Sequence, residues 1–137
     1  MISIRNAKPS DMDKVFEIAL KYDLDSNDMD YKDFIIAEDN NKIAGFGRLW
    51  KHDDAIELGT VGVVEEYRGK KVAEKIIKEL LNRTDKDVYL TTLIPGFFEK
   101  FGFKMLDVAP PQSMIRKKEW CEGCTKVGCT VMKLSRS

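Results

Sequence analysis

VGVVEEYRGKKVA, residues 61–73, passes from a β-strand pattern into an α-helix pattern through a short basic turn. From Val72 onward the apolar side chains recur at helical spacing. A helix N-terminus exposes unpaired backbone N–H groups and a partial positive charge, so it binds phosphate well. Fixed charges are added to the turn by Arg68, Lys70 and Lys71. On residue types alone, a phosphate-binding turn and a solvated basic helix start both stay open.

Strand and helix patterns alternate along the rest of the chain. Apolar alternation and β-branched runs predict strands near residues 2–4, 34–37, 42–50, 55–64, 88–92, 103–108 and 130–134. Helical spacing predicts helices at residues 10–19, capped by Ser10, at 72–81, and at 95–101, ended by Gly102. An early hairpin at residues 34–50 and a strand–helix–strand unit at 61–90 together favour a mixed α/β sheet over a purely parallel one.

Length and composition limit the class of protein. The 137 residues suit one domain, residues 1–137, and 43% hydrophobic with 34% charged residues is ordinary for a globular protein. The formal net charge is zero, so no overall basic field favours nucleic acid. No apolar run approaches the ~18 residues of a membrane span, and no secretion leader is visible. We therefore expect a cytoplasmic protein without a nucleic-acid or membrane partner.

The basic turn resembles the acetyl-CoA signature of the GNAT superfamily of N-acetyltransferases, Gln/Arg-x-x-Gly-x-Gly/Ala. Arg68 takes the first place and Ala73 the last, while Lys71 stands where the family has its middle glycine. The resemblance implies that acetyl-CoA is the cosubstrate. It implies that the diphosphate is held by the backbone of Arg68, Gly69, Lys70, Lys71, Val72 and Ala73. It also implies that the preceding strand, at Val61 and Val63, pairs with the pantetheine arm.

The resemblance extends downstream. VYLTT at residues 88–92 and FFEKFGF at 97–103 are similar to the paired strand and aromatic helix of the same superfamily, and most similar to the branch with N-acetylglutamate synthase and arsinothricin N-acetyltransferases. This implies the GNAT fold, a mixed, mostly antiparallel sheet with a splayed central strand pair flanked by helices. It further implies direct attack of a small, amino-acid-like amine on acetyl-CoA. The resemblance also implies that Phe98 lies beside the cofactor, at the position where many members have a tyrosine acid.

Acetyl transfer to an amine needs a base, because an α-amino group with a pKa of about 8 is largely protonated near neutral pH. Glu57 matches the glutamate that many superfamily members use as this base. It is an even number of positions from Val63, so both side chains should face the same side of the strand. We expect the Val63 N–H to polarise the acetyl carbonyl. The alternative for Glu57 is an exposed strand residue without a role.

Three further positions are candidates for the acceptor. A substrate carboxylate would need a cation, and Arg48 is the first candidate, followed by Arg5, although either could be a surface arginine. Thr91 and Thr92 could donate hydrogen bonds to substrate or pantetheine, although β-branched residues suit strands in any case.

The cysteines offer a different interpretation of the chain. Cys121, Cys124 and Cys129 could chelate a metal, or they could be reduced thiols that pack the last strand, and we expect no metal. The lone histidine, His52, is interpreted as solvated. A non-catalytic acyl-CoA sensor and a metal-binding module built on residues 121–129 are the alternatives to an enzyme. The oligomeric state, monomer or homodimer, stays open.

Overall fold

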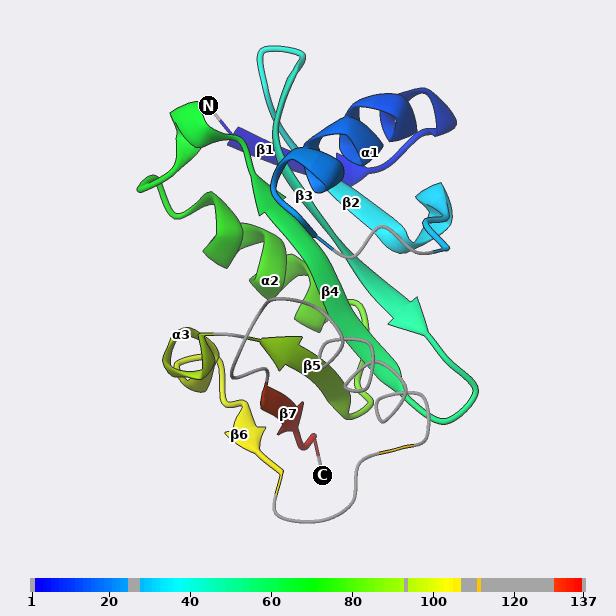
Figure 1. The fold of residues 1–137 in the computed structure, drawn as a ribbon, viewed down its shortest axis with the longest axis vertical. Coiled ribbons are helices and arrows are strands. Elements are labelled where there is room, and N and C mark those ends of the chain that lie inside the picture. The colour runs from blue at the N-terminus through cyan, green and yellow to red at the C-terminus, as the bar shows by residue number, and fades with distance from the viewer. Residues whose placement is uncertain (1, 25–27, 93, 107–110, 112–129, 137) are drawn as a thin grey trace. The chain divides into compact units, whose positions relative to one another are not determined.

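A computed structural model describes residues 2–24, 28–92, 94–106, 111 and 130–136 of the chain. The chain forms two compact units. The N-terminal unit contains residues 1–50 and 58–84, and the C-terminal unit contains residues 51–57 and 85–137. Figure 1 labels the elements of both units.

The N-terminal unit holds four neighbouring strands in the order β1-β2-β3-β4. Their bounds are Ile2–Asn6 for β1, Phe34–Asp39 for β2, Lys42–Lys51 for β3 and Ile56–Val63 for β4. The last residue of β3 and the first two residues of β4 belong to the C-terminal unit. β1 and β2 are antiparallel, as are β2 and β3. The β2–β3 hairpin turns at Asn40 and Asn41, whose φ angles of 49° and 69° suit a two-residue turn. The predicted hairpin is confirmed.

Two longer helices pack on opposite faces of these strands. Helix α1, Met12–Lys21, places Val15 and Ile18 against Phe34 and Phe46. Helix α2, Val72–Asn82, buries the apolar stripe predicted for it, which consists of Val72, Ile76, Ile77, Leu80 and Leu81. Short 3-10 turns at Pro9–Asp11, Tyr31–Asp33 and Glu65–Tyr67 connect the elements. The predicted helix at 72–81 is confirmed.

Two glycines of β3 allow α2 to approach the sheet closely. A Cβ at Gly47 would lie 2.8 Å from Ile76 Cγ2. At Gly45 it would lie 2.7 Å from the Gly62 carbonyl oxygen and 3.1 Å from Ile76 Cδ1. Because real Cβ atoms do not approach so closely, glycine is required at both positions. The helix that follows the basic turn is thereby held firmly in the N-terminal unit.

The C-terminal unit contains the strands β5, Val88–Thr92, β7, Thr130–Leu134, and β6, Lys104–Met105, in the order β5-β7-β6. β7 is antiparallel to both of its neighbours, β5 and β6. Glu57, at the start of β4, pairs in parallel with Tyr89 of β5. Helix α3, Pro95–Glu99, is shorter than the predicted 95–101, and Gly102, with a φ of 97°, lies in the turn that follows it. The mixed, mostly antiparallel sheet expected from the sequence is confirmed.

Two further sequence predictions about element ends are wrong. Ser10 does not cap the first helix: α1 begins at Met12, and the backbone N–H of Lys8 instead donates to Asp11 Oδ2 at 2.7 Å. The strand expected at 103–108 is shorter, since only Lys104–Met105 is a strand among the described part of that range. Within the described residues, no helix combines the length and apolar character needed to cross a membrane.

Candidate functional site

The basic turn before α2 adopts left-handed backbone conformations at two positions. Gly69 has a φ of 82°, and Lys71, the residue that precedes the first turn of α2, has φ 62° and ψ 26°. A side chain with a Cβ is disfavoured in this region, which explains why a glycine would suit position 71. In the described chain no side chain caps the N-terminus of α2, and Arg68, Gly69, Lys70 and Lys71 are exposed. The turn therefore presents open backbone N–H groups among three cations.

Arg68 is held in place by residues of the N-terminal unit. Its Nε donates to the Val63 carbonyl at 3.3 Å, and its guanidinium lies 4.6 Å from the centre of the Tyr22 ring. The Tyr22 hydroxyl in turn accepts from the Glu65 backbone N–H at 3.1 Å. Sequence reasoning missed Tyr22, because nothing in the pattern of α1 shows that its C-terminal end reaches the basic turn. Tyr22 thus links α1 to the segment that leads into the turn.

Strand β4 has an irregular backbone at Thr60, which has a φ of 48°. Burial alternates after this residue, with Val61 and Val63 half-buried and Gly62 buried, but Glu57 and Leu58 are both buried before it. The even spacing of Glu57 and Val63 therefore gives no information on whether their side chains share a side, because the alternation that the prediction assumed is broken.

Arg48 is not a surface arginine. It is fully buried, and its Nε donates to Thr60 Oγ1 at 3.0 Å while Nη1 donates to the Asp28 carbonyl at 3.2 Å. The Trp50 ring centre lies 4.0 Å from the guanidinium carbon. In this arrangement Arg48 fastens the irregular part of β4 to the segment at Asp28, and it presents no surface to a substrate carboxylate.

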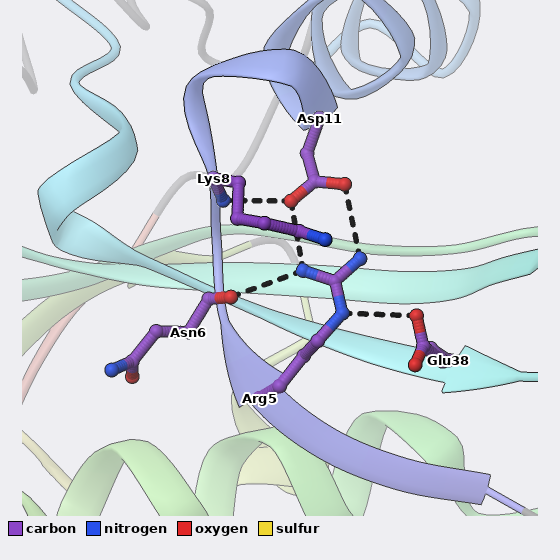
Figure 2. Close-up of polar contacts among 5 residues, drawn as sticks. All are labelled: Arg5, Asn6, Lys8, Asp11 and Glu38. Carbon is purple, nitrogen blue, oxygen red and sulfur yellow. Dashed lines mark hydrogen bonds and ion pairs between the residues drawn. The ribbon is translucent and has the colours of Figure 1, made fainter. Parts of the chain in front are cut away.

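Arg5, the second candidate cation, is committed to structural ion pairs (Figure 2). Its guanidinium binds both carboxylate oxygens of Asp11, at 2.8 and 3.0 Å, and its Nε donates to Glu38 at 2.9 Å. The hydrogen bonds from Arg5 hold the pKa of Asp11 below its ordinary value, and those to Asp11 raise the pKa of Arg5. Arg5 therefore joins β1, β2 and the turn before α1.

Glu57 lies in the C-terminal unit and is only 2% exposed. The distance between its Oε1 and Nε2 of His52 is 2.9 Å, and 18% of the His52 side chain is exposed. The interpretation of His52 as merely solvated is wrong, because the β3–β4 connection folds its ring back onto β4. A histidine five positions before a strand glutamate gives no periodic signal, so sequence reasoning could not find this pair.

The two threonines of β5 differ in their surroundings. Thr92 is buried, and its hydroxyl oxygen accepts from the Ile94 backbone N–H at 2.9 Å, which fixes the entry into α3. The Thr91 hydroxyl oxygen is buried and has no hydrogen-bond partner among the described residues. Since Glu57 pairs with Tyr89 and Thr91 follows Tyr89 by two positions, Glu57 and Thr91 share one face of the sheet.

Phe98 packs edge-on against Phe97, at 5.1 Å between ring centres, and against Phe103, at 6.1 Å. A shallow groove of about 320 Å³ lies beside this cluster and is lined by Glu99, Gly102, Phe103, Lys104 and Met105. None of the predicted site residues lines it. The three cysteines lie outside the described residues, and no group of metal-binding side chains occurs within them.

A family model for the acetyltransferase (GNAT) domain matches residues 30–105, more than half of the chain. The chain belongs to the GNAT acetyltransferase family. This confirms the superfamily resemblance seen in the basic turn and in the aromatic helix. The matched range contains the basic turn, Glu57, Arg48 and both threonines of β5.

Solved structures share the fold of this GNAT protein at low sequence identity. Rv2747 from Mycobacterium tuberculosis, in complex with CoA and NLQ, is 20% identical with a TM-score of 0.77, over 97% of this chain and 98% of that one. N-acetylglutamate synthase from Neisseria gonorrhoeae, complexed with coenzyme A and N-acetyl-glutamate, is 14% identical with a TM-score of 0.81, over 100% of this chain and 35% of that one. Arabidopsis thaliana Naa50, in complex with the bisubstrate analogue CoA-Ac-MVNAL, is 20% identical with a TM-score of 0.71, over 98% of each.

Proposed function

We propose that the chain is an acetyl-CoA-dependent N-acetyltransferase in which residues 1–137 act as one domain. The observation that carries this proposal is the exposed basic turn before α2, with left-handed backbone at Gly69 and Lys71 and an uncapped helix behind it. A diphosphate bound there would accept hydrogen bonds from the backbone N–H groups and would be balanced by nearby cations. CoA bound to the three structural neighbours, two as CoA itself and one within a bisubstrate analogue, supports the same ligand.

The reaction we propose is direct attack of a neutral amine on the acetyl carbonyl. The C–N bond forms as the amine loses its proton to a base, and the C–S bond then breaks to release the CoA thiolate. Glu57 is our candidate base, and the Val63 N–H is our candidate for polarising the carbonyl. Phe98 cannot donate a proton, so the thiolate would take one from water.

The acceptor that we propose is a small, amino-acid-like amine. Two neighbours bear on this choice in opposite directions, since one was solved with N-acetyl-glutamate and another with a peptide-containing analogue. Arg48 and Arg5 are both engaged within the fold, so either would have to leave its present partners to bind a substrate carboxylate. Thr91, with its buried hydroxyl, and Thr92 stay our candidates for a hydrogen bond to substrate or pantetheine.

The proposal is tested by release of free thiol from acetyl-CoA in the presence of single amines. The panel contains the common free amino acids and short peptides with a free N-terminus, and each rate is compared with the rate without an amine. We expect at least one amine to raise thiol release well above that background. Arg68→Ala should raise the KM for acetyl-CoA, whereas Lys78→Ala, an exposed lysine at the end of the second turn of α2, should not.

A non-catalytic acyl-CoA sensor is the alternative that the departures at Lys71 and Phe98 favour. It predicts saturable binding of acetyl-CoA with no turnover of any amine in the panel. It also predicts that Glu57→Gln changes nothing that can be measured with acetyl-CoA. Turnover by the wild-type protein would exclude this alternative.

A further inference from the structure

The carboxylate of Glu57 is sealed from solvent but bonded to a side chain that reaches it. Only 2% of Glu57 is exposed, its Oε1 lies 2.9 Å from His52 Nε2, and 18% of the His52 side chain is exposed. Both residues belong to the C-terminal unit, and both lie within the stretch from residue 51 to 57. The histidine therefore contacts the buried carboxylate while part of its own side chain is exposed.

A base that acts in every turnover must also discharge the proton that it has taken. An exposed carboxylate does this directly into water, but a carboxylate as buried as Glu57 needs a neighbouring group that can accept and pass on a proton. Imidazole is suited to this task because its two nitrogens can receive a proton on one side and release one on the other.

We propose that His52 is a positioning and proton-relay residue for Glu57, an inference that rests on the proposed acetyl transfer. At rest the neutral His52 ring carries its hydrogen on Nε2 and donates it to Oε1 of the Glu57 carboxylate. Once the amine has given its proton to Glu57, exchange of the ring proton with water moves the hydrogen to Nδ1, and Nε2 takes the proton from the carboxyl group. The imidazolium then loses its Nδ1 proton to water, which restores the carboxylate and the resting tautomer, so no other reactant is consumed.

A purely structural role for His52 is the competing explanation. The backbone of the β3–β4 connection is closed by a hydrogen bond from the His52 N–H to the Ala55 carbonyl, at 2.8 Å, which does not depend on the side chain. The turn should therefore survive replacement of the imidazole. A structural role would be filled by any side chain that keeps the hydrogen bond to Glu57, whereas a relay needs a side chain that takes up a proton.

The test compares four variants by the thiol-release assay, using the best acceptor of the panel. His52→Ala should lower kcat about tenfold or more while the KM for acetyl-CoA stays within about twofold. His52→Gln, which keeps a hydrogen-bonding group near Oε1, should remain as slow as His52→Ala. Added imidazole should restore His52→Ala at least severalfold and should leave Glu57→Gln slow. Lys51→Ala, at the exposed last residue of β3 next to His52, should behave as the wild type.

Each outcome decides for or against the relay. Wild-type kcat in His52→Ala, full activity in His52→Gln, or no response of His52→Ala to imidazole would overturn it while leaving acetyl transfer intact. If His52→Ala fails to fold by thermal melting, His52→Gln alone decides, with a slow but folded enzyme expected. Absence of turnover in the wild type would overturn the proposed function and the relay together.

Discussion

Replacing Lys71 by glycine should make the protein more stable, although it removes a side chain from the basic turn. Lys71 has a φ of 62°, and a residue with a Cβ pays about 1–2 kcal/mol in the left-handed region. Glycine loses about 0.5–1 kcal/mol through its greater freedom in the unfolded chain. The difference predicts that Lys71→Gly raises the free energy of unfolding by about 0.5–1 kcal/mol. At about 3 °C per kcal/mol for a chain of this size, Tm should rise by about 2–3 °C.

The matched control is Lys70→Gly, because Lys70 is also exposed and lies outside the left-handed region. This variant gains nothing from relief of strain and should lose about 0.5–1 kcal/mol. Urea unfolding of both variants and the wild type measures the two differences under identical conditions. A loss of stability in Lys71→Gly equal to that in Lys70→Gly would refute the reasoning, since position 71 would then not be strained.

Three other perturbations test the structural roles assigned above. Arg48→Met should lower the free energy of unfolding by about 1–3 kcal/mol, because the buried Thr60 hydroxyl and the part-buried Asp28 carbonyl lose their donor. The exposed Lys14→Met should cost less than about 0.5 kcal/mol in the same urea titration. Asp11 has a lowered pKa in the folded state, so its contribution to stability is complete above its ordinary value of 3.8 and is lost as the pH falls through the lower folded value. Asp11→Asn should therefore flatten the acid side of the stability profile, and an unchanged profile would contradict the ion pair with Arg5. Thr92→Val should lower the free energy of unfolding by about 1 kcal/mol, because the hydrogen bond from the Ile94 N–H is lost. Thr91→Val should leave stability unchanged or raise it, because the Thr91 hydroxyl has no partner among the described residues. Equal losses of stability in the two variants would contradict this distinction.

Elements with a clear hydrophobic period could be predicted from the sequence. The stripe from Val72 to Leu81 recurs at helical spacing and is buried as expected, and the polar turn at Asn40 joins two strands as a hairpin. These features depend on neighbours along the chain, which a single sequence displays directly. The basic turn was also recognisable, because its residue types and spacing resemble a family signature.

The side-chain environment of the site could not be predicted in the same way. Arg48 stands in an otherwise apolar strand, and its burial depends on Thr60 and on the Asp28 carbonyl, which are distant in sequence. One signal was present: the continuous apolar run around Arg48 lacks the alternation of a strand with a solvated face. His52 and Thr60 gave no signal, since each depends on a local departure from regular strand geometry.

The measurement that tests the account most directly is a titration of the isotope-labelled protein with acetyl-CoA, followed by backbone amide ¹H–¹⁵N spectra. The account predicts saturable binding with the largest shift changes at the amides of Gly69 to Ala73, because these groups would hold the diphosphate. Saturable binding with its largest changes at the groove around Phe103 and Lys104, or no binding at millimolar acetyl-CoA, would contradict the assignment of the cofactor to the turn before α2.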